Sequence, residues 1–345
     1  MPLRMMRSIC AGALVAVALF SAGGAGAQTA VLYGLLDASG SYFKPVGTDD
    51  HLLHLTNGNM QTSFIGVRGS EDLGGGLRAV YRLESFLRVD VGAAGRDVGD
   101  GFWAREASAG LSGSFGTTVI GRTPTPLWLA LTSFNPFGES FGFSPTVRQY
   151  FGGSLPGSSM LGDTRWNNSV WYTNNPRDPL RVVLSFNADE TTPNHSNGHN
   201  LGLSVSYITG PFAATLVGET IRNSSQPLPP GFDRQIVLHG GATYDFQFVR
   251  VYGQAGRFKT DATDDTRATS YQLGLAVPFG NSLIMAAYGH HHVSTPLQAT
   301  TNRITSIGYD YFLSKSTDIY VAASYEKLSF VSSGNSFAGG VRVKF

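Results

Sequence analysis

The last residues of the chain, Phe337-Ala-Gly-Gly-Val341-Arg342-Val343-Lys344-Phe345, have the pattern of a strand with two different faces. Its apolar side chains occupy every second position, with Arg342 and Lys344 between them. A strand with this pattern has one apolar face and one charged face, as in a barrel whose outside meets lipid and whose inside holds water. The same alternation recurs in Leu201–Tyr207 and in Ile307–Tyr311. The sequence therefore predicts an all-β, antiparallel transmembrane barrel.

Residues 1–27 have the order of a secretory signal peptide. Basic residues precede an apolar run from Ile9 to Phe20, and small residues end the segment at Ala25-Gly26-Ala27. The apolar run is shorter than the roughly 20 residues that a membrane-spanning helix needs. We expect cleavage after Ala27, which leaves residues 28–345 as a single barrel domain.

The composition excludes several classes of protein. Removal of Arg4 and Arg7 with the signal peptide leaves 23 Lys and Arg residues (25 − 2) against 24 Asp and Glu, so no general basic face is available for nucleic acid. The one cysteine, Cys10, is also removed, which excludes disulfides. After the signal peptide no apolar stretch is long enough for a membrane-spanning helix. Since only helices and closed barrels satisfy all backbone polar groups in lipid, a barrel remains.

Short and long connections between the expected strands alternate. Seven short turns fall at residues 71–75, 112–116, 174–178, 209–211, 245–247, 278–281 and 314–316. Eight longer polar connections fall near residues 44–61, 90–101, 123–164, 188–199, 222–232, 260–267, 293–301 and 329–334. Fifteen connections join sixteen strands, with both chain ends on the short-turn, periplasmic side. A barrel of about 16 strands is wide enough for an aqueous channel.

The connection over residues 123–164 differs from the others in length and in aromatic content. Its aromatic residues are Trp128, Phe134, Phe137, Phe141, Phe143, Tyr150 and Phe151. Long connections without evident secondary structure are usually functional or disordered, and a solvated disordered loop has no need of so many aromatic rings. We expect this loop to fold into the lumen, bury its rings against the wall and narrow the pore. The alternative is a loop packed over the barrel mouth or against a neighbouring subunit.

The chain resembles a known family over essentially the whole mature length. The segments that carry the resemblance are Ser63–Ala79, Leu83-Glu84-Ser85, Ala109–Thr117 with Gly121-Arg122, Asn168-Ser169-Val170 before Tyr172, and the terminal Phe345. Together they are similar to the trimeric general porins of Gram-negative outer membranes, in the β-proteobacterial branch. The resemblance implies a 16-stranded barrel, a homotrimer and a third loop folded into the lumen. It also implies passive diffusion of small hydrophilic solutes and ions through a water-filled channel.

The resemblance further implies where the pore is narrowest. Arg68, Arg105 and Arg165 match positions where such porins place basic residues on the wall, and strand alternation turns Arg82 and Arg78 to the same side. For Arg68, Arg82 and Arg105, the simpler alternative is that they only hydrate the lumen or pair with Glu84 and Glu106.

The loop departs from the family pattern. Where the family has Pro-Glu-Phe-Gly, this chain has Asn135-Pro136-Phe137-Gly138-Glu139, so the acid has moved. Glu139 and Asp163 are the only acids of the loop, and we expect Arg148 to oppose them. Phe64 also departs, because relatives usually have Arg there. We therefore expect a constriction that is more aromatic and less acidic than usual, formed by the wall arginines and Glu139, with a preference for anions.

The sequence supports other functions less strongly than a general diffusion channel. A substrate-selective porin for sugars or for aromatic or organic anions is the closest alternative, because Trp128 and Phe134 could form an apolar path. A structural or adhesive barrel is a further one. His195-Ser196-Asn197-Gly198 is similar to a run in outer-membrane phospholipases, but adjacent strand residues point to opposite faces, which separates base from hydroxyl. We therefore expect no enzyme.

No cofactor or metal is expected either. His290-His291-His292 lacks accompanying carboxylates or cysteines, and its members diverge along a strand. Asp261, Asp264 and Asp265 could attract divalent ions or cations bound to lipopolysaccharide, as many acidic loops do. The expected partners are outer-membrane lipid, lipopolysaccharide and the barrel assembly machinery, which the resemblance implies would read the strand ending in Phe345.

Overall fold

The structure is a computed structural model that describes residues 29–152, 160–175, 177–188, 198–224 and 227–345. The expected signal peptide therefore lies outside the described residues, as do His195, Ser196 and Asn197. No helix in the described part of the chain is long and apolar enough to cross a membrane.

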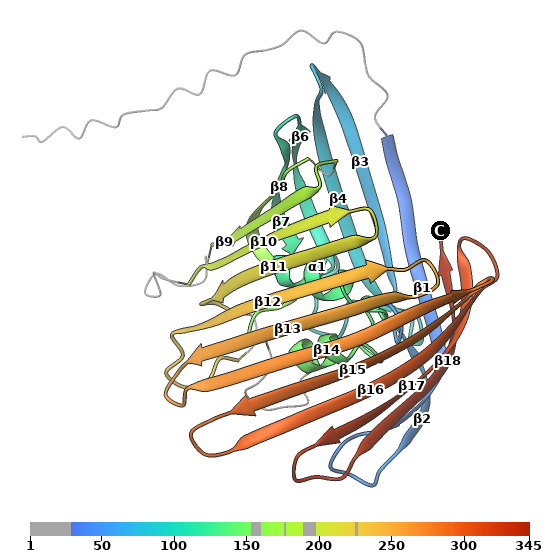
Figure 1. Cartoon of the computed structure of the whole chain (residues 1–345). Coiled ribbons are helices and arrows are strands. Elements are labelled where there is room, and N and C mark those ends of the chain that lie inside the picture. The colour runs from blue at the N-terminus through green and yellow to red at the C-terminus, as the bar shows by residue number, and fades with distance from the viewer. Residues whose placement is uncertain (1–28, 153–159, 176, 189–197, 225–226) are drawn as a thin grey trace, which may run out of the picture.

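Antiparallel strands make up almost the whole structure (Figure 1). The strands are β1 (Thr29–Lys44), β2 (Leu52–Asn57), β3 (Phe64–Gly74), β4 (Leu77–Arg88), β5 (Ala93–Ala94), β6 (Glu106–Gly113), β7 (Gly116–Pro124), β8 (Arg165–Thr173), β9 (Leu180–Asn187), β10 (Asn200–Thr209), β11 (Phe212–Ile221), β12 (Arg234–Asp245), β13 (Arg250–Asp261), β14 (Thr266–Phe279), β15 (Ser282–Ser294), β16 (Ala299–Phe312), β17 (Thr317–Leu328) and β18 (Gly334–Lys344). The helices within the described ranges are α1 (Pro126–Ser133) and α2 (Pro145–Phe151).

The sheet closes into a barrel of sixteen wall positions. On one edge, β1 pairs with β18; on the other, its first half pairs with β3 and its second half with β2. Strands β2 and β3 thus share one position in the wall, and the two-residue β5 pairs only with the end of β4. Of the 18 strands this leaves 16 positions (18 − 2), which confirms the predicted number.

The first long connection is not the simple loop that we expected. It contains β2, and the wall is interrupted between Asn57 and Phe64. The carboxylate of Asp37 on β1 accepts hydrogen bonds from the backbone N–H groups of Met60 and Gln61, both at 2.8 Å. One buried side chain therefore satisfies backbone groups that the interrupted ladder leaves without partners.

Successive residues of each strand alternate between the outside and the lumen. On β16, Ile307 and Tyr309 are exposed on the outside, whereas Ser306 and Asp310 are buried on the inside. Apolar side chains outside and polar side chains inside are the reverse of the arrangement in a soluble protein, and they fit a wall surrounded by lipid.

The C-terminal residue completes the seam between β1 and β18. The backbone N–H of Gly34 donates to the carbonyl oxygen of Phe345 at 3.0 Å, and the N–H of Phe345 donates back at 3.1 Å. A Cβ atom on Gly34 would lie 2.6 Å from the Phe345 ring. Only glycine therefore leaves room for the terminal ring at this place.

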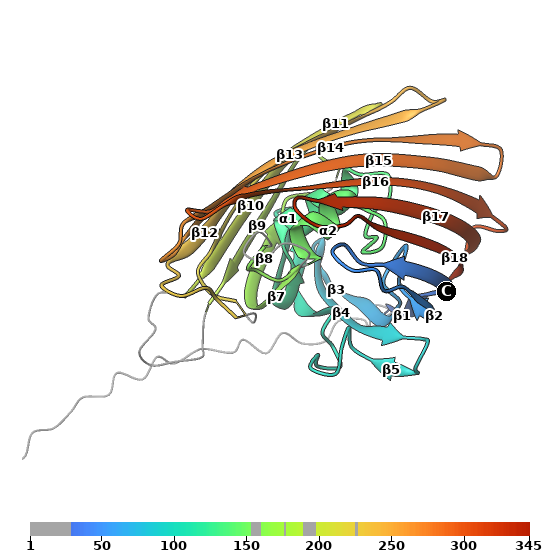
Figure 2. The same ribbon diagram turned by 90° about the horizontal axis from the view of Figure 1, so that it is seen from below.

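The chain between β7 and β8 enters the barrel, as predicted for the aromatic loop (Figure 2). We call residues 125–152 and 160–164 the inward loop. In contrast to our expectation it has secondary structure, α1 and α2. Both helices begin in the same way: Thr125 and Ser144 accept hydrogen bonds from backbone N–H groups of the first turn, and each is followed by proline. These are strong helix-start signals.

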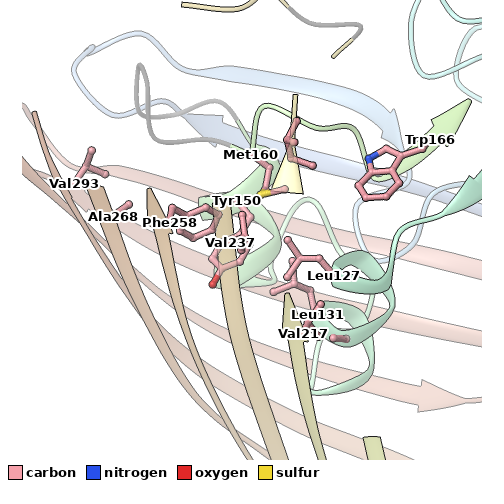
Figure 3. Packing of buried hydrophobic residues seen from close by; sticks show 12 residues of the cluster. Leu127, Leu131, Tyr150, Met160, Trp166, Val217, Val237, Phe258, Ala268 and Val293 are labelled. Atoms are coloured by element: carbon pink, nitrogen blue, oxygen red, sulfur yellow. The ribbon is translucent and has the colours of Figure 1, made fainter. Parts of the chain in front are cut away.

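Apolar contacts hold the inward loop against the wall formed by β10 to β16. Figure 3 shows Leu127 and Leu131 of α1 near Val217 on β11. Tyr150 of α2 packs edge-on against Phe258 on β13, with ring centroids 4.6 Å apart. Burial of the rings, which we had inferred from the aromatic content, is confirmed by Trp128, Phe134, Phe137, Phe143 and Tyr150.

Polar anchors fix the two helix starts. The backbone N–H of Leu127 donates to Glu219 on β11 at 2.8 Å, and that of Thr146 donates to Gln272 on β14 at 2.9 Å. Lumen-facing glycines accept the loop closely: a Cβ atom at Gly289 would lie 2.5 Å from Pro145. The inward loop is therefore fitted to one half of the wall, and the other half faces the remaining space.

Candidate functional site

Among the cavities that the described residues line, two lie on opposite sides of one layer of side chains inside the barrel. The upper cavity, on the long-loop side, has a volume of about 470 Å³ and is lined in part by Arg96 and Phe141. The lower cavity, on the short-turn side, has a volume of about 530 Å³ and is lined in part by Arg82 and Trp171. They share no lining residue. We call the contacting side chains between them the neck: Phe64, Glu84, Phe86, Arg105, Trp128, Glu139 and Arg165.

Arginines and aromatic rings alternate across the neck. The guanidinium carbon of Arg105 lies 4.1 Å from the ring centroid of Phe64 and 5.5 Å from that of Phe86. The guanidinium carbon of Arg165 lies 5.4 Å from the same Phe86 ring and 5.7 Å from Trp128. Such contacts are attractive because the face of an aromatic ring is electron-rich. One series of stacked groups thus joins the barrel wall to α1.

Two carboxylates hold Arg105. Its Nε lies 2.9 Å from Glu84 Oε2 on the wall, and its Nη2 lies 3.3 Å from Glu139 Oε2 on the inward loop. Its Nη1 donates to Thr62 Oγ1 at 3.1 Å. Arg105 is only 6% exposed. Arg105 therefore shares its charge between a wall acid and a loop acid, and it fastens the loop to the wall.

Arg165 is equally buried, at 5% exposure, but it has a different environment. Its Nη1 donates to Thr164 Oγ1 at 3.1 Å. Within the described ranges, no carboxylate oxygen lies within 4 Å of its guanidinium group: Glu84 and Glu139 pair with Arg105, and Asp163 pairs elsewhere. Arg165 thus adds a positive charge to the neck without an ion pair among these residues.

Arg68 and Arg82 lie below the neck and face the lower cavity. They are direct partners in the register of β3 and β4, so their side chains share a face. Arg82 Nη1 lies 3.2 Å from Glu106 Oε2, with 44% of the Arg82 side chain exposed but only 10% of Glu106. The guanidinium carbon of Arg68 lies 4.7 Å from the ring of Tyr33. The groups presented to water here are arginines.

Asp163 does not lie in the neck, although it belongs to the inward loop. Its carboxylate pairs with Arg96 and with Arg122, each at 2.8 Å, at the mouth of the barrel. Burial alone would raise the pKa of Asp163, but the hydrogen bonds and charges of these two arginines outweigh it and lower the pKa below its ordinary value. Asp163 therefore stabilises the mouth of the barrel through its ion pairs.

The expectation that Arg148 opposes Glu139 and Asp163 is wrong. Arg148 lies on α2 and pairs with Glu326 on β17, and its Nη1 donates to Ser324 at 3.0 Å. The reason is geometric: α2 lies against the wall of β14 to β16, so its polar side chains reach wall residues before they reach the neck. Arg148 is a further anchor of the inward loop.

Bases exceed acids over the neck and the lower cavity. The bases are Arg68, Arg82, Arg105 and Arg165, and the acids are Glu84, Glu106 and Glu139. The difference is one positive charge (4 − 3). The pairing with Glu84 and Glu106, which we kept as the simpler alternative, is present at Arg105 and Arg82.

The histidine run diverges as expected. His291 is buried on the lumen side beside Tyr150, whereas His290 and His292 lie on the outer side of β15. No group of three or more potential metal ligands occurs among the residues that the structure describes.

Sequence reasoning missed Phe86 and the roles of Phe64 and Glu84. Phe64 was noted only as a departure from the family, yet it lies under Arg105. The alternation that turns Arg82 to the lumen would also have turned Glu84 and Phe86 there, but no signal in the sequence brings β6, β8 and α1 to them.

The fold and the neck together define a class: an outer-membrane β-barrel channel with a loop folded into its lumen. The family model of the Gram-negative porins matches residues 13–329. Outer membrane porin protein 32 of Delftia acidovorans is 30% identical, with 96% of this chain and 92% of the relative covered. An outer membrane porin of Bordetella pertussis is 27% identical, with 96% and 98% covered.

Solved structures agree on the fold. An anion-selective porin from Comamonas acidovorans has a TM-score of 0.79 at 23% identity, with 92% of this chain and 100% of that chain covered. OmpT of Vibrio cholerae in its trimer form has a TM-score of 0.70 at 14% identity, with 93% and 100% covered. The chain belongs to the Gram-negative porin family. It is an outer-membrane protein that forms a water-filled channel for passive diffusion of small hydrophilic solutes and ions.

Proposed function

We propose that this channel prefers anions and that Arg68, Arg82, Arg105, Arg165 and Glu139 set the charge at its constriction. The observation that carries the proposal is the difference in exposure between Arg82 and its acidic partner Glu106 below the neck. There the arginine side chains face the cavity, whereas their acidic partner Glu106 is nearly buried. A permeating ion therefore meets positive charge first. Fixed charges along a narrow path exclude ions of the same sign.

The neck supports the same conclusion. Arg165 has no ion pair among the described residues, and Arg105 is shared between two acids. The anion selectivity named for the Comamonas porin is consistent with this proposal. The proposal assigns no catalytic step to the chain.

Reversal potentials in a salt gradient across a planar bilayer test the proposal. The double variant Arg68→Gln, Arg82→Gln should shift the reversal potential toward cations, because two exposed positive charges are lost while Glu106 remains. Arg250→Gln is a suitable control, since Arg250 lies at the short-turn rim and pairs with Asp245. An unchanged reversal potential in the double variant, with the barrel intact, would count against the proposal.

Selectivity for aromatic or organic anions is a second candidate. The lower cavity places Arg68 and Arg82 beside apolar side chains of Val80, Leu129 and Trp171. A solute with a carboxylate and a ring could contact both kinds of group. Concentration-dependent block of chloride current by benzoate, but not by acetate, would favour this function over general diffusion.

We also propose a homotrimer and removal of residues 1–27 on export. The trimer is supported by the family and by the trimer form of OmpT, and closed symmetric assemblies are the common case. Native mass measurement in mild detergent should give three copies, and a monomer would contradict this. N-terminal sequencing of the outer-membrane protein should begin at Gln28.

A further inference from the structure

Tyr33 on β1 lies between the neck and the lower cavity. In the register it is paired with Gly66 on β3, which is paired with Glu84 on β4. Phe64 of the neck lies two positions before Gly66, and Arg68 of the lower cavity lies two positions after it. Because residues two apart on a strand share a face, Tyr33 belongs to the row of the lumen wall between these two levels.

The Tyr33 side chain contacts both levels. Its hydroxyl donates a hydrogen bond to Glu84 Oε1 at 2.5 Å. The guanidinium carbon of Arg68 lies 4.7 Å from the centroid of the Tyr33 ring, and the ring of Phe64 packs against it edge-on at 5.8 Å. One side chain therefore supports a base of the lower cavity with its ring and holds an acid of the neck with its hydroxyl.

Gly66 makes this reach possible, because β3 lies between the strands of Tyr33 and Glu84. A Cβ atom at Gly66 would lie 2.9 Å from Glu84 Cγ and 3.1 Å from Tyr33 Cζ. A larger residue would therefore push the hydroxyl and the carboxylate apart. The bare backbone of Gly66 lets Tyr33 lean across β3 to β4.

Glu84 is held at both of its carboxylate oxygens. Tyr33 donates to Oε1, and Arg105 Nε lies 2.9 Å from Oε2. The Glu84 side chain is only 8% exposed. Among the described residues that line the lower cavity, Glu106 is the one acid. Glu84 therefore does not present its charge to the lower cavity.

Without the hydroxyl of Tyr33, Glu84 has an alternative partner. Arg82 lies two positions before Glu84 on β4, so the two side chains share a face, and 44% of the Arg82 side chain is exposed. A buried carboxylate oxygen without a donor is unfavourable, so the group would turn toward Arg82 and the water of the lower cavity. The charge of the residues at that cavity, Arg68, Arg82 and Glu106, would then fall from one positive (2 − 1) to zero (2 − 2).

We propose that Tyr33 is a positioning residue for ion selectivity. By holding Glu84 against Arg105, it keeps this acid out of the path of permeating ions and leaves the lower cavity positive. The effect on selectivity rests on the proposed preference for anions. The position of Glu84 can be measured independently of that preference.

The first test measures whether reagents in water reach Glu84. The folded protein is treated with a water-soluble carbodiimide and an amine, and labelled carboxylates are located by mass spectrometry after trypsin digestion. Glu84 and Glu139 are each the only acid of their tryptic peptides, residues 83–88 and 123–148. In wild type Glu84 should stay unlabelled, whereas Glu139, with a side chain 24% exposed, should be labelled. Tyr33→Phe, which keeps the ring, should make Glu84 reactive.

The second test measures reversal potentials in a KCl gradient across a planar bilayer. Tyr33→Phe should lower the permeability ratio of chloride to potassium, because Glu84 then faces the lower cavity. In a Glu84→Gln background the same change should have no further effect, since no charge is left to release. A merely structural role of Tyr33 would act in both backgrounds.

Tyr320→Phe is the matched control. The hydroxyl of Tyr320 also donates to a buried carboxylate of the wall, that of Asp37, at 2.7 Å. Asp37 keeps its two backbone donors, Met60 and Gln61, when this hydroxyl is removed. Neither Tyr320 nor Asp37 is among the described residues that line the upper or the lower cavity. This variant should leave the reversal potential unchanged.

Labelling of Glu84 in wild type would overturn the proposal, and this result is decisive even if Tyr33→Phe does not fold. An unlabelled Glu84 in folded Tyr33→Phe would overturn it too, as would equal shifts of the reversal potential in the two backgrounds. A wild type without anion preference would contradict the proposed function alone, provided that Tyr33→Phe still exposes Glu84 and shifts the reversal potential toward cations.

Discussion

At the scale of single residues, the two arginines of the neck differ: Arg105 forms ion pairs that hold the neck together, and Arg165 adds a charge. Arg105 lies between Glu84 and Glu139, and its removal leaves Glu84 buried without its partner. Breaking a buried pair from one side typically costs about 3–5 kcal/mol, so an Arg105 variant changes stability as well as charge. Arg165 has no ion pair in the described residues, so its charge can be removed with less disturbance.

Arg165→Gln should therefore shift the reversal potential toward cations at nearly unchanged stability. Glutamine keeps a donor near Thr164 and removes the charge. Glu139→Gln should shift the reversal potential the other way, because Arg105 then retains only its wall partner. Bilayer measurements on both variants, with thermal unfolding as the control, check this. Shifts of the same sign would show that these residues do not act through their charge.

At the scale of elements, the inward loop depends on the wall that receives it. Glycines on the lumen face leave room for prolines at the helix starts and turns, as at Gly274 opposite Pro136 and Gly289 opposite Pro145. Glu219 and Gln272 then hold the helix starts. The width of the neck follows from this docking as much as from the neck residues.

Gly289→Val should displace the start of α2 and change the single-channel conductance, because its Cβ atom alone would lie 2.5 Å from Pro145. Gly218→Val is the matched control on β11, since nothing lies within 4 Å of a Cβ atom there. Conductance of Gly289→Val equal to wild type would mean that the loop tolerates a shift without effect on the pore.

The terminal strand is a second element with a specific contact. Phe345→Ser should reduce the amount of heat-modifiable barrel in the outer membrane. The ring that lies against Gly34 is lost, and so is the terminal aromatic that the assembly machinery is expected to read. Phe330→Ser is the control, because Phe330 lies in an exposed loop. Normal abundance of Phe345→Ser would contradict the expectation.

The wall could be predicted from the sequence because alternation and short turns are local signals. The strand number, the lumen side of Arg68, Arg82 and Glu84, and the inward loop all followed from them or from the family resemblance. The interruption at β2 could not be predicted, because it depends on Asp37 reaching Met60 from another strand. The pairing of Arg148 depends equally on where α2 docks. The helix starts at Thr125 and Ser144 could have been predicted, because each of these residues is followed by proline, but no helix was predicted there.

At the scale of the whole molecule, the net charge of the chain differs from the charge of the side chains around the pore. Without residues 1–27, which we propose are removed, the chain is nearly neutral, with 23 basic residues (25 − 2) against 24 acidic ones. The neck and the lower cavity nevertheless carry one more basic than acidic side chain, and the acid beside Arg82 is nearly buried. Selectivity thus follows from placement and not from composition.

The reversal potential of the wild-type protein at two ionic strengths tests this account most directly. Purified protein is inserted into a planar bilayer with the same KCl ratio across it, first in dilute and then in concentrated solution. Screening limits the field of a fixed charge to about 10 Å at 0.1 M salt, so the preference should weaken as salt rises. A channel lined by these arginines should give a stable conductance with a chloride preference that is larger in dilute KCl. Strong potassium preference at both ionic strengths, or no conductance from the intact barrel, would contradict it.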